Sequence, residues 1–185
     1  MKKLSLLKAA AAVVVLASVP VFAQSIQSAT GTDVTLNATM TESLSVSLDV
    51  SNVNFTLTPL SATNPGSTAI NATTTWLLNG GRTAVKLYAY FDDPTAALTA
   101  GATQNIPSAN VSAAVGGTTV GTFSTAASTF SAGAGVTIFS QAITDANRNS
   151  TQSSAVTLNI DMSSTPQLGA GTYTGTLHFR AEATT

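Results

Sequence analysis

Cysteine is absent from this chain of 185 residues, and histidine occurs once, as His178. Without cysteine the chain can form neither a disulfide framework nor a thiolate metal site, and no lipid can attach to a cysteine behind an export leader. With one histidine, a zinc or copper site would need carboxylates for nearly all of its ligands. The sequence therefore predicts a domain stabilised by apolar burial and strand pairing, and we expect no metal and no cofactor.

Charged side chains are also scarce. They make up 8% of the chain, about a third of their usual share. Seven residues are basic, and three of these lie within the first eight positions. A nucleic-acid partner requires a basic surface, so none is expected. The remaining charges are dispersed and do not predict a carboxylate-rich catalytic cleft, so we interpret the protein as a non-enzyme.

The first 23 residues have the pattern of a secretory signal peptide. Three lysines precede an apolar run over residues 9–16, and Val21-Phe22-Ala23 places small residues where signal peptidase cuts. Cleavage would leave a flexible segment, residues 24–32, and no integral membrane segment. We expect a bacterial protein exported to the periplasm, the cell surface or the medium.

Apolar and polar residues alternate with period two through most of residues 33–185, which predicts one domain of half-buried antiparallel strands. Eight to ten short strands without an amphipathic helix favour a two-layer β-sandwich with immunoglobulin-like or related Greek-key connections, and a jelly roll is the alternative. The expected strands cover residues 34–40, 44–50, 70–78, 83–91, 110–115, 118–123, 136–143, 155–162 and 172–181.

Two glycine pairs predict tight turns. Asn79-Gly80-Gly81 lies between two alternating segments and predicts a hairpin whose glycines have positive φ. Gly116-Gly117 joins two shorter strand candidates in the same way.

His178 and the Asp92-Asp93 pair are the first residues to consider for catalysis. Alternation places His178 on the exposed face of the last strand, where no buried carboxylate would orient it, and the chain has no Gly-x-Ser-x-Gly motif. Adjacent strand residues point to opposite faces, and Pro94 follows directly, so turn capping is the expected function of the aspartates.

Asp145-x-Asn147-x-Asn149 has the oxygen spacing with which a calcium loop begins. Ser150 stands where the loop needs glycine, and Val156 replaces the bidentate glutamate. We therefore expect a solvated loop.

Three aromatic residues could form a platform on which a sugar stacks. Trp76 shares a face with Ile70 and Leu78, which favours core packing. Tyr88 and Tyr90 alternate onto the opposite, less buried face of their strand and are the predicted ligand-contact aromatics. They support one interpretation of the chain, a secreted carbohydrate- or ligand-binding module.

Three short stretches give the chain a resemblance to a known family. They are Asp33-Val-Thr-Leu-Asn-Ala-Thr-Met40, Thr165-Pro-Gln-Leu168 and the closing Ala170-Gly-Thr-Tyr-Thr-Gly-Thr-Leu177. The last contains the Gly-x-Tyr-x-Gly pattern of a terminal pilin strand. With its predicted secretion and lack of cysteine, the chain resembles the cysteine-free branch of the fimbrial subunits assembled by the chaperone-usher pathway.

This resemblance implies a structural or adhesive surface protein, a pilus subunit whose partners are copies of itself and a periplasmic chaperone. In that family each subunit lacks a strand, which the N-terminal extension of the next subunit supplies. The donor-strand plugs would be Val34, Leu36, Ala38 and Met40. If residues 33–40 instead pair within their own chain, they form the first strand of an ordinary core, and the sequence leaves both arrangements open.

Overall fold

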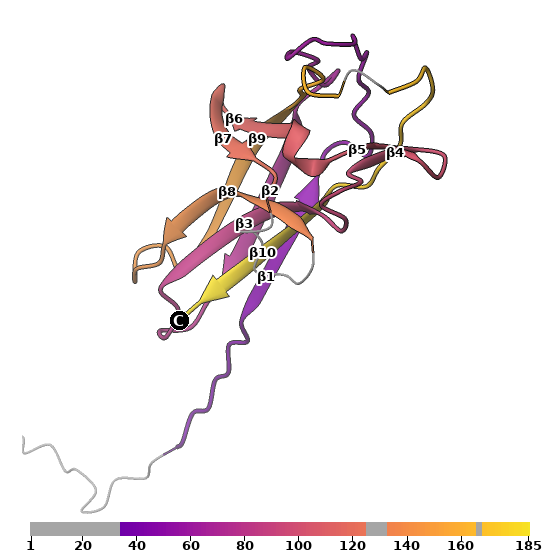
Figure 1. Ribbon diagram of the computed structural model, residues 1–185. Helices are drawn as coiled ribbons and strands as arrows, with labels where there is room; N and C mark the ends of the chain where they lie inside the picture. Colours follow the sequence, from indigo (N-terminus) through magenta and orange to yellow (C-terminus); the bar gives the residue numbers. More distant parts are fainter. Residues whose placement is uncertain (1–33, 125–132, 166–167) are drawn as a thin grey trace, which may run out of the picture. The chain divides into compact units, whose positions relative to one another are not determined.

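The computed structural model describes residues 34–124, 133–165 and 168–185. The predicted signal peptide and the predicted flexible segment, residues 24–32, lie outside these ranges. The chain divides into two units, residues 1–38 and 39–185. The described residues of the first unit, 34–38, belong to no strand. The second unit holds the described strands and is a β-sandwich, which confirms the predicted fold class (Figure 1).

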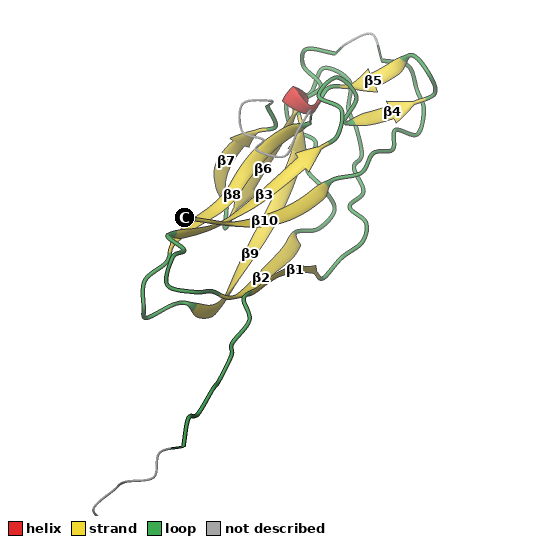
Figure 2. Ribbon diagram, turned by 90° about the horizontal axis from the view of Figure 1, so that it is seen from below, coloured by secondary structure: helices red, strands yellow, loops and turns green. Residues whose placement is uncertain are grey.

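Two antiparallel sheets form the layers of the sandwich (Figure 2). In spatial order, the larger sheet consists of β1 (Ser43–Leu48), β2 (Ile70–Leu77), β9 (Asn149–Ile160), β6 (Val111–Val115) and β7 (Thr118–Thr122). The smaller sheet consists of β10 (His178–Thr184), β3 (Ala84–Phe91) and β8 (Ala134–Ala142). A separate hairpin of β4 (Leu98–Ala100) and β5 (Gln104–Ile106) precedes the 3₁₀ turn η1 (Ser108–Asn110).

The core lies between the sheets, and the alternation in the sequence accounts for it. Most inward-facing positions of β2, β3, β6, β8 and β9 are buried, with exceptions such as Gln141 and Gln152. Trp76 is 2% exposed, and its indole N–H donates a hydrogen bond to the Asn147 carbonyl at 2.8 Å, so the prediction that it belongs to the core is confirmed.

The two long sides of the sandwich differ. On one side Ser124, just beyond β7, and Gly135 of β8 exchange two backbone hydrogen bonds of 3.1 and 2.8 Å. On the other side β1 and β10 are the outermost strands of their sheets, and no ladder between them is found among the described residues. The first side is therefore closed by backbone pairing, and the second is open.

The hairpin predicted at Asn79-Gly80-Gly81 is wrong. Both edges of β2 are occupied, by β1 and β9, so β3 pairs in the other sheet and the turn carries the chain across the sandwich. Gly80 and Gly81 do not have positive φ. The Asn79 side chain instead accepts a hydrogen bond of 2.9 Å from the N–H of Gly81. The hairpin at Gly116-Gly117 is confirmed, with φ of 57° and 83° between the paired strands β6 and β7.

Three strand predictions also require correction. The strand expected over residues 155–162 begins earlier, at Asn149, because the polar residues 149–154 pair with β2. The strand expected over residues 172–181 begins only at His178, because the chain before it lies against the β4–β5 hairpin, where Thr174 pairs with Thr99. Residues 34–40, expected as a strand, lie in no strand.

Candidate functional site: a groove along the open side

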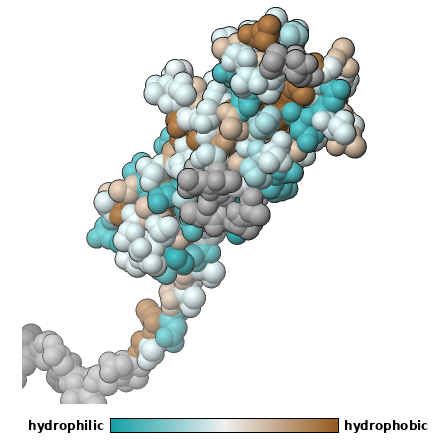
Figure 3. Space-filling view, in the orientation of Figure 1, coloured by the Kyte–Doolittle hydropathy of each residue, from teal (hydrophilic) through white to brown (hydrophobic). Residues whose placement is uncertain are grey.

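The open side of the sandwich contains a groove of about 1020 Å³, which we call the edge groove. One wall is the irregular chain after β1, residues 48–59, and the other is the chain that leads into β10, residues 168–179. Core side chains from both sheets line its floor: Ile70, Phe91, Val111, Leu158, Ile160 and Met162. Figure 3 shows brown, apolar side chains breaking the white and teal surface at the end of the body that carries β4 and β5.

The first wall is attached to the larger sheet by polar side chains. Asp49 accepts hydrogen bonds from the backbone N–H and the side-chain amide of Asn71 at 2.7 and 2.6 Å. These hydrogen bonds lower the pKa of Asp49 below its usual value, and the bond from the Asn71 side chain has the largest effect. Further along, Phe55 pairs with Gly66. A Cβ on Gly66 would lie 2.6 Å from Val53 Cγ1, so glycine is required for the wall to approach this closely.

Asn64 fastens the end of this wall to β9. Its side chain is 1% exposed, and its oxygen accepts a 2.7 Å hydrogen bond from the N–H of Thr58. Its amide nitrogen donates to the carbonyls of Ile160 and Ser61 at 2.8 and 3.0 Å. Every polar group of this buried amide therefore has a partner, as burial requires.

The second wall is held by the β4–β5 hairpin. The Gln104 side-chain oxygen accepts a hydrogen bond from the N–H of Gly169, and the Tyr173 hydroxyl lies 2.7 Å from the same oxygen. Thr174 exchanges backbone hydrogen bonds of 2.8 and 2.9 Å with Thr99. A Cβ on Gly175 would lie 1.9 Å from the Ala97 carbonyl oxygen, so only glycine allows this contact.

The described lining of the edge groove contains no aspartate, glutamate, lysine, arginine or histidine. Tyr173 is its one titratable residue, and the hydroxyl is already engaged with Gln104 and the Gly169 carbonyl. General acid–base chemistry needs a titratable side chain within reach of the substrate. The described lining of the groove therefore presents mainly apolar side chains and neutral polar groups.

The four residues predicted as donor plugs are exposed. Val34, Leu36 and Met40 have 79%, 88% and 80% of their surface accessible, and Ala38 is also exposed. The residues between them are polar, so apolar side chains fall at every second position of a chain without secondary structure. Regular exposed apolar series of this kind are uncommon on protein surfaces.

The predicted exposure of Tyr88 is wrong, because Tyr88 is 4% exposed. It follows Leu87 at a bulge, where β8 contributes Ile138 as an extra residue and the register shifts. Burial at Leu87, Tyr88 and Ala89 in succession breaks the alternation on which the prediction was based. Of the two predicted ligand-contact aromatics, only Tyr90 retains partial exposure.

His178 packs against Tyr90 instead of standing among threonines. The two rings stack with centroids 5.1 Å apart, and each covers one face of the other. The His178 Nε2 atom lies 3.1 Å from an Asp92 carboxylate oxygen. Asp93 accepts two 2.7 Å hydrogen bonds, from the N–H and the hydroxyl of Thr95, which confirms its function as a turn cap.

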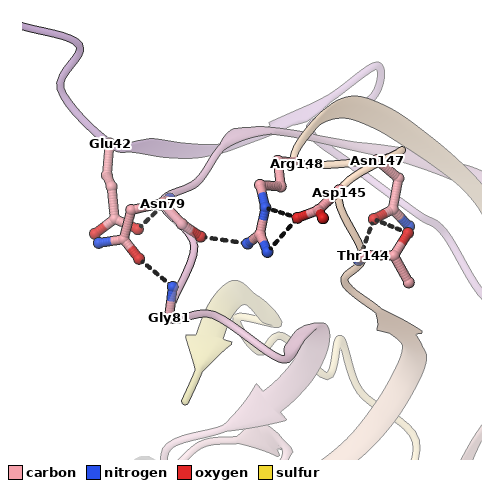
Figure 4. A network of polar contacts seen from close by, with 7 residues as sticks. All are labelled: Glu42, Asn79, Gly81, Thr144, Asp145, Asn147 and Arg148. Carbon is pink, nitrogen blue, oxygen red and sulfur yellow. Dashed lines mark hydrogen bonds and ion pairs between the residues drawn. The ribbon is translucent and has the colours of Figure 1, made fainter.

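Asp145 and Asn147 form part of a structural network (Figure 4). Asp145 accepts hydrogen bonds from Arg148, whose other terminal nitrogen donates to the Asn79 carbonyl at 2.6 Å. The Asn147 oxygen accepts a 2.7 Å bond from the N–H of Thr144. The side chains that resembled the start of a calcium loop thus close the turn before β9.

Glu42, also in Figure 4, was not singled out from the sequence, because its partners are distant in the chain. It accepts hydrogen bonds from Arg82 Nε and Nη2 at 3.1 and 3.0 Å and from the Asn79 N–H at 2.9 Å. These hydrogen bonds lower the pKa of Glu42, and the bond from Arg82 has the largest effect. Arg82 also donates to the Ala183 carbonyl at 3.3 Å, so this ion pair links the starts of β1 and β3 to the end of β10.

Within the described ranges, no three histidine, cysteine or carboxylate residues gather closely enough to hold a metal ion. Nor does the described part of the chain contain a helix with the length and apolarity needed to cross a membrane. Comparison with known protein families, curated proteins and solved structures found no significant similarity to this chain.

Proposed function

We propose that this protein is a structural subunit of an extracellular polymer, in which residues 34–40 of one copy fill the edge groove of the next copy as an added strand. The observation that carries the proposal is the open side of the sandwich. Core side chains form the floor of an uncharged groove there, and β10 is the outermost strand of its sheet. An edge strand presents unpaired backbone groups to which another chain can add.

The exposed plug series supports the same proposal. An extended segment of seven residues spans roughly 23 Å, and its alternate side chains face one way. Val34, Leu36 and Met40 would then enter the groove while Thr35 and Asn37 face outward. Burial of each large apolar side chain is worth about 1.5–3 kcal/mol, and added backbone hydrogen bonds offset the ordering of the segment.

The open groove is also the reason to propose a second protein partner, one that covers the groove before assembly. Before assembly, the apolar walls at Val53, Phe55 and Leu177 would invite aggregation, so another chain must cover them. The resemblance to chaperone-usher subunits implies a periplasmic chaperone in this position. The alternative of a carbohydrate-binding module has less support, because Tyr88 is buried and Tyr90 is stacked on His178.

The test is the mass of the exported protein in solution, measured by size-exclusion chromatography with light scattering. Leu36→Asp removes the central plug and is expected to abolish polymers. Thr35→Asp adds the same charge to the neighbouring residue and is expected to leave them. Both positions are exposed, so neither change should alter folding.

A mixing experiment separates donation between copies from pairing within one chain. Val50→Trp fills the edge groove with a bulky side chain but leaves residues 34–40 intact. Leu36→Asp leaves the groove intact. Each variant alone should be a monomer, and an equimolar mixture should form heterodimers. A wild-type monomer at all concentrations, or polymers of Leu36→Asp equal to those of the wild type, would overturn the proposal.

A further inference from the structure

We infer that Asn79 is a site of spontaneous covalent modification, at which the side-chain amide is lost through a cyclic imide and replaced by a carboxylate. Asn79 is the one asparagine of the sequence that is followed by glycine. Both residues are exposed, in the turn that carries the chain from β2 to β3. The reaction needs only water as its co-reactant, and the inference does not depend on the proposed polymer.

The reaction takes place within one pair of neighbouring residues. The Gly80 amide nitrogen gives its proton to hydroxide and attacks Asn79 Cγ, so a succinimide ring closes as the Cγ–Nδ2 bond breaks. The departing nitrogen takes a proton from water and leaves as ammonia. A water molecule then opens the ring at either carbonyl, which leaves aspartate or isoaspartate at position 79. Because both reacting groups belong to adjacent residues, their encounter costs little entropy.

Arg148 prepares the nitrogen that attacks (Figure 4). Its Nη1 atom donates a 2.6 Å hydrogen bond to the Asn79 carbonyl oxygen, which belongs to the same peptide unit as the Gly80 N–H. A cation bound to this oxygen withdraws electron density from the peptide nitrogen, so the N–H loses its proton more readily. Asp145 accepts hydrogen bonds from Nε and Nη2 of the same guanidinium at 2.9 and 2.8 Å, which holds Nη1 toward the carbonyl.

The same turn prepares the carbon that is attacked. The Gly81 N–H donates a 2.9 Å hydrogen bond to the side-chain oxygen of Asn79. Attack at Cγ places negative charge on this oxygen, so an N–H that is already aimed at it stabilises the charge as it forms. The backbone N–H of Asn79 donates to Glu42 at 2.9 Å, which holds the residue from its other side.

The turn is accessible to the base that must remove the proton. A Cβ on Gly80 would meet nothing within 4 Å, and the Gly80 N–H has no acceptor among the described residues. Hydroxide can therefore reach this proton, and no side chain on residue 80 obstructs the ring. Asn64 provides the contrast, because it is buried and Pro65 after it has no N–H with which to attack.

The product would change the network around the turn. Aspartate adds a second carboxylate to the residue that Glu42 binds, and isoaspartate also adds a methylene group to the backbone between β2 and β3. In the isoaspartate form, the former Asn79 carbonyl becomes a carboxylate. Arg148 already contacts this oxygen, so its positive charge stabilises the isoaspartate product.

The test follows the folded full-length protein during incubation at one pH slightly above neutral. Peptide mass spectrometry that separates aspartate from isoaspartate gives the rate at each asparagine. In the wild type, Asn79 should gain about 1 Da before any other asparagine does. Gly80→Ala should slow this gain at least about tenfold, because the methyl group obstructs ring closure, although it meets nothing in the fold.

Two comparisons separate the effect of the structure from that of the Asn-Gly sequence. The folded wild type should react at least about fivefold faster than the same protein unfolded in urea. Arg148→Gln should slow the folded protein about fivefold and lower the share of isoaspartate. Arg82→Gln removes the same charge from the same turn, but the Arg82 side chain binds Glu42 and the Ala183 carbonyl, so this variant should not be slower.

A rate in the folded protein equal to or below that of the unfolded protein would overturn the inference. So would a rate and a product ratio in folded Arg148→Gln equal to those of the wild type. The comparison of folded with unfolded wild type needs no variant, so the inference can be tested even if Arg148→Gln fails to fold.

Discussion

Core residues lie behind both long sides of this sandwich, but backbone pairing closes only one of the two sides. On the closed side, the chain beyond β7 pairs with β8 at Ser124 and Gly135, and Phe123 packs edge-on against Phe91 with ring centroids 4.8 Å apart. On the open side, the chain before β10 bends away to pair with β4, and the edge groove remains. Because backbone pairing closes one side and not the other, the proposed donor strand is assigned to the open side.

The largest expected effect on the free energy of unfolding comes from truncating one aromatic side chain on each side, Phe123 on the closed side and Phe55 on the open side. Phe123 is fully buried, and Phe123→Ala should reduce the free energy of unfolding by about 3–5 kcal/mol. Phe55 on the open side is only half-buried in the isolated subunit, so Phe55→Ala should cost roughly half as much. Urea denaturation measures both. Equal losses would mean that the open side is as well packed as the closed side.

Glycines allow close backbone contacts on both sides. A Cβ on Gly133 would lie 2.2 Å from the Phe91 carbonyl oxygen, and one on Gly175 would lie 1.9 Å from that of Ala97. Either substitution by alanine should cost about 3 kcal/mol in urea denaturation.

Gly80→Ala is the matched control for these two variants, since a Cβ there meets nothing within 4 Å and the residue has no positive φ. Its effect should stay within about 0.5 kcal/mol. If Gly175→Ala behaved like this control, residues 172–176 would not be held against β4 as described.

A stabilising change is expected in the interior that both sides share. The Thr74 hydroxyl is buried and has no hydrogen-bond partner among the described residues. Thr74→Val keeps the shape of the side chain and removes the unpaired group, so the free energy of unfolding should rise by about 1 kcal/mol. Thr75→Val, at an exposed position of the same strand, is the control. A loss of stability in Thr74→Val would indicate that the hydroxyl has a partner.

The smallest effect concerns the ion pair that links β1 and β10 at one end of the open side. Hydrogen bonds, chiefly from Arg82, lower the pKa of Glu42 in the folded state, while the unfolded value remains near 4.5. The contribution of the Glu42 carboxylate to the free energy of unfolding is therefore complete above pH 4.5. It is lost as the pH falls through the lower pKa of the folded state. Wild type should exceed Glu42→Gln in stability at neutral pH and equal it in acid.

An Arg82→Gln background provides the control for this pH dependence, because it removes the larger cause of the shift. In that background, the loss of stability caused by Glu42→Gln should be smaller at neutral pH than it is in the wild type. A loss that persists in acid would show that Glu42 stabilises the fold through packing and not through its charge.

Local patterns in the sequence predicted much of the fold. Period-two alternation located β1, β2, β3 and the β6–β7 hairpin, since side-chain direction in a strand depends only on neighbouring residues. The same patterns missed the edge groove. Val53, Phe55 and Leu57 alternate like a strand, but they lie against the core without a full ladder, and nothing local distinguishes the two cases.

By itself, the sequence determined the all-β class, the absence of thiol chemistry, the tight turn at Gly116-Gly117 and the apolar series at residues 34–40. These follow from residue type and from spacing over a few positions. Only the tertiary structure decided that β2 and β3 belong to different sheets, that Tyr88 is buried and that one side stays open. These features depend on which distant strands pair. The backbone hydrogen bonds of a strand fit many partner strands about equally, and packing of the whole core selects among them.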